Sequence, residues 1–493
     1  MTWPRFCALA FIAVFFSCAH LLSQSADSSS LKFVHVTVID TRGGSRQNDM
    51  TVVISGGLIQ WMGKSAESNE KPSVQRPRER VIDAEGKFLI PGLWDMHTHI
   101  AGINANPTWA RDVLVPLLVA NGITGIRDMG GDLDALEAWR RAIKDGTLLG
   151  PHIVAAGPML LPAPRSSAPA PPPDPAIVRI ASPEEAQAAV DRLKRRGADF
   201  IKVIDLPRDS YFALAEETKR DGISFVGHVP ARVTAVEASD AGQKSIEHII
   251  YSSLAFDCSS NEEELRKKRL AGDAQEAEAT DEANSTFSPE KAAALWRTFR
   301  RNGTWVTPTL FSIRANARRL EDSPDDPQLA FLPASLRKEW TPTTLAQGDR
   351  DTAAWWERQF ENDRKLTGEM HRAGVRLLAG SDSLDRYVFV GTSLHEELRM
   401  LMEAGLTPLE ALQAATRNPA DFLGRKNEGA IAPGYAADLV LLDADPIENI
   451  ANTRKIRAVV LSGRYFARDE LDGMLAKARA AAAAVGAAPA SSR

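Results

Sequence analysis

Short apolar segments alternate with helical patterns through the middle of the chain, from about residue 90 to residue 428. This alternation constrains the fold most, because strands that alternate with helices form parallel sheets covered by helices. Eight such strands predict an α/β fold with a (β/α)8 TIM barrel, and an open doubly wound sheet is the alternative. The candidate strands are Phe88–Ile90 continuing into Asp95–His99, Gly122–Asp128, His152–Ala156, Asp199–Ile204, Ser224–His228, Ser245–His248, Thr304–Thr309 and Val375–Ser381.

Two short β-rich regions flank this middle part. Residues 31–63 alternate apolar and polar side chains around the Gly56-Gly57 turn, and similar apolar runs return near the C-terminus. Such runs are typical of short strands, so we expect both chain ends to build one small sandwich. The predicted domains are a composite β-sandwich over residues 31–89 and 429–468, the barrel over 90–428, and a helical tail that becomes disordered over 469–493.

The first residues resemble a targeting signal. Arg5 precedes an apolar run, Phe6–Phe16, which is too short for a stable membrane span, and small residues follow. We therefore predict a signal peptide over residues 1–26, export to the periplasm or the exterior, and no stable membrane span after cleavage. An uncleaved anchor and a lipoprotein lipidated at Cys18 are the alternatives.

Composition narrows the class of partner. The chain of 493 residues has a net charge of −5 and no long basic run, which argues against a nucleic-acid-binding protein. Its three cysteines do not suffice for a disulfide framework. We expect a small-molecule substrate, and the sequence leaves open whether the protein is a homo-oligomer.

Polar residues occur where several of the predicted strands end. His97 and His99 are two residues apart, so both imidazoles project from the same face of a strand. The carboxyl ends of barrel strands converge on one site, which would bring these side chains together. Imidazole, lysine and carboxylate groups at one site suit a pair of metal ions. The full set of predicted ligands is His97, His99, Lys202, His228, His248 and Asp382.

Each of these residues also has a structural interpretation. His228 could be a hydrogen-bonded loop histidine, His248 could cap a helix, and Asp382 could be an N-cap. Lys202 lies inside an apolar run, where a buried lysine is costly unless it is paired or chemically modified, although its ammonium could also extend to water. We favour the metal site because all of these residues fall at the ends of predicted strands or, for Lys202, within one.

These motifs together resemble the amidohydrolase superfamily, in particular its imidazolonepropionase-like and prolidase-like binuclear metal-dependent hydrolases. The similarity extends over about residues 31–470. The matching segments are Pro91–His99 (PGLWDMHTH), Gly122–Gly131 (GITGIRDMGG), Gly227–Pro230 (GHVP), Ser245–His248 (SIEH), Ala379–Asp382 (AGSD), Gly405–Leu412 (GLTPLEAL) and Gly434–Val440 (GYAADLV).

The resemblance implies a role for each ligand. His97, His99 and Asp382 would hold the more buried metal ion, and His228 and His248 would hold the second. Lys202, carboxylated on its side-chain nitrogen, would bridge the two ions as a carbamate. Zinc is the expected metal for imidazole and oxygen ligands, with cobalt or manganese as alternatives.

The resemblance also implies a reaction. A hydroxide bridging the metal ions would attack an amide carbonyl, and Asp382, as the catalytic residue, would pass the proton to the leaving nitrogen. We therefore expect an exported amidohydrolase acting on dipeptides or N-acyl amino acids. Hydrolysis of cyclic amides, lactones or carbamates is the alternative, and a non-catalytic, metal-stabilised binding protein is a further one. Val229-Pro230 departs from the pattern common in the peptidase-like relatives.

Residues that could bind the substrate are less constrained. Loops after the predicted strands carry candidates for a substrate carboxylate or carbonyl, although each could equally be a surface or packing residue. Trp355-Trp356 suit helix packing, while Asp128 and His152 suit structural roles. We expect an extended loop over 160–175 and a solvated helix or mobile loop over 259–286. The substrate-binding candidates are Tyr251, Arg232, Arg386, Tyr387 and His395.

Overall fold

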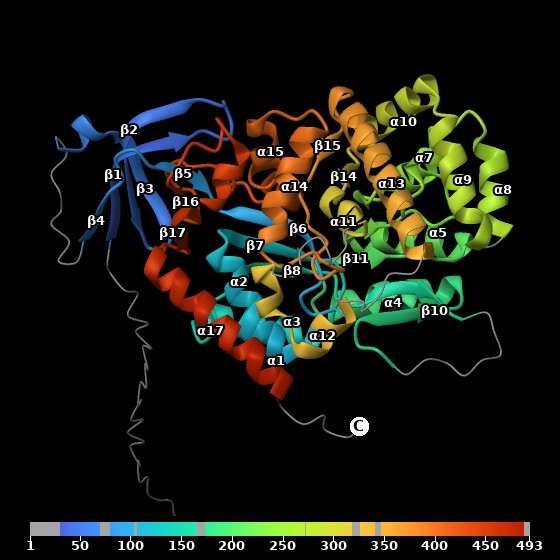
Figure 1. Ribbon diagram of the computed structural model, residues 1–493, viewed down its shortest axis with the longest axis horizontal. Helices are drawn as coiled ribbons and strands as arrows, with labels where there is room; N and C mark the ends of the chain where they lie inside the picture. Colours follow the sequence, from blue (N-terminus) through green and yellow to red (C-terminus); the bar gives the residue numbers. More distant parts are fainter. Residues whose placement is uncertain are drawn as a thin grey trace, which may run out of the picture.

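The computed structural model describes residues 30–69, 79–102, 106–164, 173–271, 273–317, 326–340 and 347–487 (Figure 1). The predicted signal peptide, residues 1–26, lies outside them. No helix in these ranges is long and apolar enough to cross a membrane.

Parallel strands form the centre of the molecule. One sheet has the order β6-β7-β8, and a second has the order β10-β9-β11-β12-β13-β14-β15. All pairings in both sheets are parallel. The strands are β6 (Leu93–Thr98), β7 (Ile123–Asp128), β8 (His152–Ala155), β9 (Met159–Pro162), β10 (Ile177–Ile180), β11 (Phe200–Val203), β12 (Ser224–Gly227), β13 (Ser245–Glu247), β14 (Trp305–Thr307) and β15 (Arg376–Leu377).

Backbone hydrogen bonds link the edges of these two sheets. The Asp199 N–H donates to the Ala155 carbonyl at 2.9 Å, which connects β8 with the start of β11. The Met96 N–H donates to the Ala379 carbonyl at 2.9 Å, so β6 lies beside the segment that follows β15. The three-stranded sheet therefore contacts the other sheet at both of its edges, through β11 and through the segment after β15, consistent with a TIM-barrel-like α/β domain.

Helices lie between most of the successive parallel strands, as the sequence pattern predicts, whereas β8, β9 and β10 follow one another with no helix among the described residues between them. The Ser182 hydroxyl accepts from the Glu185 N–H at 3.3 Å, and Pro183 follows as the first helical residue, so α4 begins at a side-chain cap. The helices between or after the strands are α2 (Val115–Ala120), α3 (Leu133–Lys144), α4 (Pro183–Arg195), α5 (Arg208–Asp221), α6 (Ala235–Asp240), α10 (Pro289–Asn302), α13 (Gln347–Arg372) and α14 (Thr392–Glu403).

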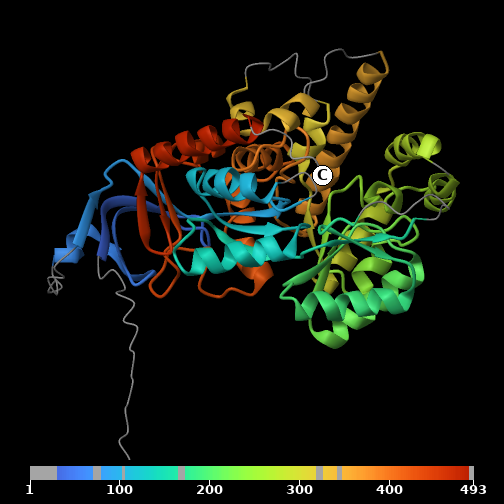
Figure 2. The ribbon, with the colours of Figure 1, turned by 90° about the horizontal axis from the view of Figure 1, so that it is seen from below.

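Both ends of the chain contribute to one further sheet. Its order is β18-β17-β16-β5-β1-β2-β3, with β4 also paired to β1. Figures 1 and 2 show these strands together at one end of the molecule. The strands are β1 (Ser30–Ile39), β2 (Arg46–Ser55), β3 (Leu58–Lys64), β4 (Glu79–Asp83), β5 (Phe88–Pro91), β16 (Leu439–Leu442), β17 (Ile456–Leu461) and β18 (Arg464–Ala467).

Smaller elements complete the described chain. The C-terminal helix α17 packs on α2, as both views show. The remaining elements are η1 (Ser65–Asn69), α1 (Pro107–Trp109), η2 (Ala110–Leu114), α7 (Leu254–Asp257), α8 (Glu262–Ala271), α9 (Asp273–Ser285), α11 (Leu310–Ala315), η4 (Pro327–Phe331), α12 (Ala334–Trp340), α15 (Pro408–Ala414), α16 (Arg417–Leu423), η5 (Ile450–Arg454) and α17 (Arg468–Ala487).

Two segments differ in detail from the sequence-based expectation. The expected loop over 160–175 begins in β9, which pairs with β10, and residues 165–172 lie outside the described residues. The charged segment over 259–286 forms two helices, α8 and α9, which pack on each other. Only one residue of α8, Leu265, is buried among its charged neighbours, so the helix is largely solvated.

Candidate metal centre

All six predicted ligands lie where the parallel strands end, around one cavity of about 290 Å³. Five of them line it directly, and His97 is fully buried beside it. His97 lies near the end of β6 and His99 follows it, Lys202 lies in β11, His228 follows β12, His248 follows β13, and Asp382 follows β15.

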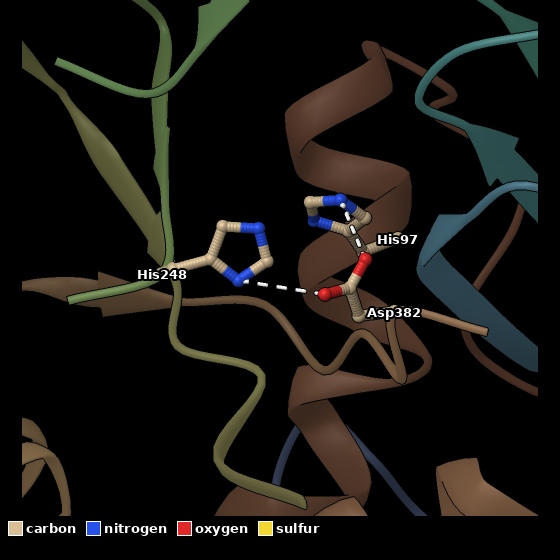
Figure 3. Close-up of side chains that lie close together, drawn as sticks. All are labelled: His97, His248 and Asp382. Carbon is tan, nitrogen blue, oxygen red and sulfur yellow. Dashed lines mark ion pairs between the residues drawn. The ribbon is translucent and has the colours of Figure 1, made fainter. Parts of the chain in front are cut away.

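Asp382 is the centre of this group. One of its carboxylate oxygens, Oδ1, lies 3.3 Å from His97 Nε2 and 3.4 Å from His99 Nε2. The other oxygen, Oδ2, lies 3.8 Å from His248 Nδ1 (Figure 3). The ligand atoms of His97, His248 and Asp382 all fall within 4.8 Å of one another, which a single metal ion can bridge.

The other histidines extend the group across the cavity. The ring of His97 lies 4.7 Å from that of His248, centroid to centroid, and the ring of His228 lies 5.0 Å from that of His248. Four imidazoles, a carboxylate and a lysine therefore meet at one site.

The local backbone explains why these strands end here. Gly227 has φ 131°, and a Cβ at this position would lie 1.9 Å from the Val203 carbonyl oxygen, so only glycine lets β12 approach β11 before His228. His248 and Asp382 have left-handed φ values of 57° and 62°. Such strain in residues with side chains is characteristic of functional sites, where surrounding contacts hold it.

Burial and mutual charge set the protonation states of the site. Burial lowers the pKa of His97 and His228 well below the usual range, and that of His248 to about 4, so these imidazoles are neutral at neutral pH. Burial raises the pKa of Asp382, but the neighbouring histidines outweigh it and hold that pKa well below its usual value. His97, His228 and His248 therefore offer neutral nitrogens and Asp382 an anionic oxygen, the forms that bind metal ions. Burial also lowers the pKa of His99, but the hydrogen bond and charge of Asp382 outweigh it and raise that pKa.

Lys202 is unusual among these groups. It is fully buried, and its Nζ has no hydrogen-bond partner among the described residues. Burial lowers its pKa to about 8, against the opposing charges of Glu247 and Asp382. A buried amine without a partner is costly, and it is also more easily deprotonated and reactive than an exposed one.

The residues present fit divalent metal ions. His97 Nε2, like Lys202 Nζ, is buried without a hydrogen-bond partner in the described chain, although it faces the Asp382 carboxylate. Metal-ligating histidines usually donate their second ring nitrogen to a carboxylate or carbonyl. His97 Nδ1 lies 3.0 Å from Glu247 Oε2, and His99 Nδ1 lies 3.1 Å from the Gly130 carbonyl, which matches that pattern.

Two residues that the sequence analysis did not single out support the site from below. Arg127 and Glu247 are fully buried, and the Arg127 guanidinium donates to both Glu247 oxygens at 2.9 Å. Arg127 also donates to the Met96 carbonyl at 2.6 Å, beside His97. Arg127 lies inside the apolar run of β7. A charged residue in such a run is the signal by which Lys202 was found, so the sequence could also have indicated Arg127.

Further supporting contacts come from β6 and from the segment after β14. Asp95 accepts from the Ser381 N–H at 2.9 Å and from its hydroxyl at 2.6 Å, which fixes the approach to Asp382. Thr309 Oγ1 lies 2.5 Å from His248 Nδ1, and the Ser312 hydroxyl donates to Asp382 Oδ2 at 3.1 Å. These contacts orient the ligands. The spacing of the contacting residues in the sequence did not predict this role.

Two of the five predicted substrate residues line cavities at the site. Tyr251 lines the cavity of the six ligands and stacks on His228 at 5.8 Å between ring centroids. Arg232 lines an adjoining groove. Asp128 is buried beside the site and accepts from the Gly130 N–H at 3.3 Å, as its expected supporting role requires.

The structure places the other three predicted substrate residues away from the cavity. Arg386 and Tyr387 both donate to the Trp340 carbonyl, and Tyr387 is buried. The ring nitrogens of His395 bond Thr453 Oγ1 at 2.9 Å and the Asn121 carbonyl at 3.1 Å. Each side chain joins packed elements and does not line the cavity, so a substrate contact by these three residues stays a prediction.

Comparison with known proteins identifies the family. The sequence profile described as the Amidohydrolase family matches residues 88–465. The chain belongs to this family. Among curated relatives of this amidohydrolase is the ochratoxinase of Aspergillus niger, which is 24% identical over 499 aligned positions that cover 89% of this chain and 86% of the relative.

Solved structures share the amidohydrolase fold. Bottromycin amidohydrolase superposes with a TM-score of 0.68 at 24% identity, over 92% of this chain and 90% of the other. A Xaa-Pro dipeptidase with methionine in its active site superposes with a TM-score of 0.65 at 20% identity, over 89% of this chain and 100% of the other. At these identities the likeness establishes the fold.

Proposed function

We propose that this amidohydrolase is an exported enzyme that uses two divalent metal ions, with zinc as the metal, to hydrolyse the amide bond of dipeptides or N-acyl amino acids. One observation carries the proposal: five potential ligands line one cavity with His97 buried beside it, and the buried Lys202 amine has no hydrogen-bond partner among the described residues. The family, and relatives named as an ochratoxinase, a Xaa-Pro dipeptidase and an amidohydrolase, support amide hydrolysis.

In this proposal the ligands divide as the resemblance implies. His97, His99 and Asp382 would hold one ion and His228 and His248 the other, with Lys202 as a further ligand once its neutral amine has added carbon dioxide to form a carbamate. Carboxylation would convert the buried Lys202 amine into an anion. The site would then no longer hold an unpartnered amine, whose protonated form would be a cation beside two metal cations. When bound, the ions would lower the pKa of a water and polarise the amide carbonyl.

The chain's own residues carry the proton. Asp382 is ionised at neutral pH because its histidine neighbours lower its pKa, so it can accept the proton of the attacking water. It then donates this proton to the amide nitrogen as the carbon–nitrogen bond breaks. The products are an amine and a carboxylate. Ser312, which donates to Asp382 Oδ2, holds the carboxylate in position for both transfers.

Two structural expectations belong to the same proposal. We propose that β6, β7, β8 and β11 to β15 form a closed (β/α)8 barrel, and that the mixed sheet from both chain ends folds as a small sandwich. The edge-linking hydrogen bonds support the first, and the pairing of β5 with β16 supports the second. Export over the 1–26 signal would place the protein in the periplasmic or extracellular fraction of its host.

The test is amine release from a library of dipeptides and N-acyl amino acids by the zinc-loaded protein, with metal content measured in parallel. Asp382→Asn should lower kcat by about a hundred- to ten-thousandfold, because the proton acceptor is lost. Asp421→Asn, at an exposed site on α16, is the control and should retain activity. Unchanged turnover in Asp382→Asn would refute the mechanism, and silence across the library with two metals bound would redirect the search to lactones, carbamates and cyclic amides.

A further inference from the structure

A second, larger cavity opens directly from the cavity of the six ligands. This groove has a volume of about 1020 Å³ and shares Ile204, His228 and Tyr251 with the smaller cavity. Small-molecule sites typically have volumes of about 300–1,000 Å³. The two compartments are unequal, so a substrate that spans them has a small end at the ligands and a larger end in the groove.

One wall of the groove is a continuous row of aromatic rings that begins at the candidate metal centre. The Tyr251 ring stacks on His228 and lies 6.3 Å from the Trp356 ring, centroid to centroid. Trp356 in turn lies 4.9 Å from Trp355, and Phe256 lines the same groove. Such a wall favours a flat aromatic group, which gains both apolar burial and ring–ring contact.

The charged side chains that line the groove are mainly positive. Among the described residues they are Arg179, Arg232 and Arg269 against a single acid, Asp205. Arg232 is exposed, and its guanidinium has no hydrogen bond or ion pair with any described residue, whereas Arg179 donates to the Pro162 carbonyl at 3.3 Å. A guanidinium with free donors at the wall of a substrate groove suits a carboxylate, which it can bind through two parallel hydrogen bonds.

We propose that the groove binds an aromatic amino acid through its ring and its carboxylate, so that the preferred substrates are N-acyl aromatic amino acids with a small acyl group. The ring lies on the wall of Tyr251 and Trp356, and the carboxylate pairs with Arg232. The acyl group then occupies the smaller cavity, where the scissile carbonyl reaches the ligands. This inference rests on the proposed amide hydrolysis and adds the class of leaving group.

The proposed substrate carries its aromatic ring and its carboxylate on the same side of the scissile amide bond. The aromatic wall and Arg232 line the same groove, so one substrate group must satisfy both. An aromatic acyl chain joined to glycine would put the ring and the carboxylate on opposite sides of the scissile bond. An aromatic amine without a carboxylate would leave Arg232 unpaired.

Three substrates separate these contributions. N-acetyltryptophan carries both groups, N-acetyltryptamine lacks the carboxylate, and N-acetylalanine lacks the ring. For the zinc-loaded protein we expect kcat/KM for N-acetyltryptophan to exceed that for N-acetyltryptamine by about ten- to hundredfold, the range for hydrogen bonds to charged groups. It should exceed that for N-acetylalanine by about tenfold or more.

Variants assign the effects to residues. Arg232→Ala should lower kcat/KM for N-acetyltryptophan by about ten- to hundredfold, mainly through KM, and change N-acetyltryptamine by no more than about twofold. Arg232→Lys should restore part of the loss. Trp356→Ala should weaken both indole substrates and spare N-acetylalanine. Arg195→Ala, an arginine 72% exposed on α4 that does not line the groove, is the matched control and should leave all three unchanged.

The possible outcomes separate a failure of the groove assignment from a failure of the proposed amide hydrolysis. Turnover of all three substrates without preference, or an equal loss in Arg232→Ala for N-acetyltryptophan and N-acetyltryptamine, would overturn the groove assignment and leave amide hydrolysis intact. If no substrate is turned over, amide hydrolysis of this class fails, and calorimetric binding of L-tryptophan decides the groove separately. Binding of L-tryptophan that is lost in Arg232→Ala would support the groove, and no binding would overturn it.

Discussion

Arg127 and Glu247 form an ion pair with no exposed side-chain surface, directly beneath the ligands. Glu247 holds His97 through Nδ1, while Arg127 bonds Glu247, the Ser245 hydroxyl and the Met96 carbonyl. Burial lowers the pKa of both Arg127 and His97, and burial raises that of Glu247, but Arg127 and Lys202 more than offset this rise. Glu247 is therefore an anion that fixes the orientation of His97.

Arg127→Met should show how much the site depends on this pair. Removing one partner leaves a buried, uncompensated carboxylate, so we expect a loss of about 3–5 kcal/mol in the free energy of unfolding, measured by denaturant titration. Metal affinity should fall by about 10- to 100-fold, because the partner that orients His97 is disturbed. Arg301→Met breaks the exposed pair with Asp240 and is the control, with a loss below about 1 kcal/mol. Equal losses in the two variants would contradict this role.

At the residue scale, the sequence predicted the candidate metal ligands better than the residues that hold these ligands in position. Lys202 and the histidines were found because polar residues at strand ends are conspicuous, and the structure brings all six predicted ligands together. Glu247 was missed although it precedes His248, because its partner Arg127 is 120 residues away. The contacts that the structure shows for Arg386, Tyr387 and His395 could not be predicted either, because only packing decides which way such side chains turn.

The short helix α11 holds two contacts to the site. Thr309 precedes it and bonds His248, and Ser312 within it bonds Asp382. Glu397 from α14 lies at the start of α11 and accepts from the Phe311 N–H at 2.8 Å. Glu397 is fully buried, and burial raises its pKa to about 8. The start of α11 therefore depends on the Glu397 carboxyl group, which is protonated at neutral pH.

This protonation makes stability depend on pH. The folded pKa of Glu397 lies above its unfolded value of 4.5, so the stabilisation is fully present below about pH 4.5 and is lost as pH rises through about 8. Glu397→Gln keeps an acceptor for Phe311 without a titratable proton. We expect it to remove this loss, so that it unfolds at higher denaturant concentration than wild type at about pH 9 and similarly at about pH 5.

The matched variant is Glu397→Ala. It leaves the buried Phe311 N–H without a partner and should cost about 1–3 kcal/mol at every pH, with a lower kcat because α11 shifts. Denaturant titrations of the three proteins across this pH range provide the check. Parallel pH profiles for wild type and Glu397→Gln would show that Glu397 does not titrate with folding.

Local sequence patterns predicted most of the regular helices and strands, but they did not predict the short or irregular segments. Seven of the eight predicted strands correspond to β7, β8 and β11 to β15, and the Ser-Pro signals mark the starts of α4 and α10. The first predicted strand is divided: Asp95–His99 overlaps β6, whereas Phe88–Ile90 lies in β5 of the sheet of the chain ends. The pairing of β9 with β10 could not be predicted, since β9 has only four residues and precedes a proline-rich stretch. The strand β15 is shorter than predicted, because the chain leaves regular pairing to form the strained segment around Asp382.

On the scale of the whole molecule, a partly buried polar contact joins the sheet of the chain ends to the parallel sheets. His152 at the start of β8 bonds Asp438 at 2.9 Å between Nε2 and Oδ2, and Asp438 immediately precedes β16. The Gly92 N–H also donates to the Asp438 carbonyl, at 2.7 Å. The histidine that the sequence analysis assigned a structural role thus lies where the two regions meet.

The charge of His152 should couple this contact to pH. Burial lowers the pKa of His152, but the hydrogen bond and charge of Asp438 outweigh it, so the pKa is raised above 6.5. A raised folded pKa gives stabilisation that is complete below about pH 6.5 and disappears as pH rises through the folded pKa. His152→Asn should therefore lower Tm relative to wild type more at about pH 5.5 than at about pH 8.5.

The size of this effect is limited by exposure, because the side chain of His152 is 34% exposed. A partly exposed pair contributes about 0.2–1 kcal/mol, so thermal unfolding must be followed at both pH values with all variants in parallel. Asp438→Asn should remove the same pH-dependent difference, and adding His152→Asn to it should change the pH profile no further. Additive effects in the double variant would mean that the two side chains act separately, and that apolar packing and backbone contacts such as Gly92 with Asp438 hold the two regions together.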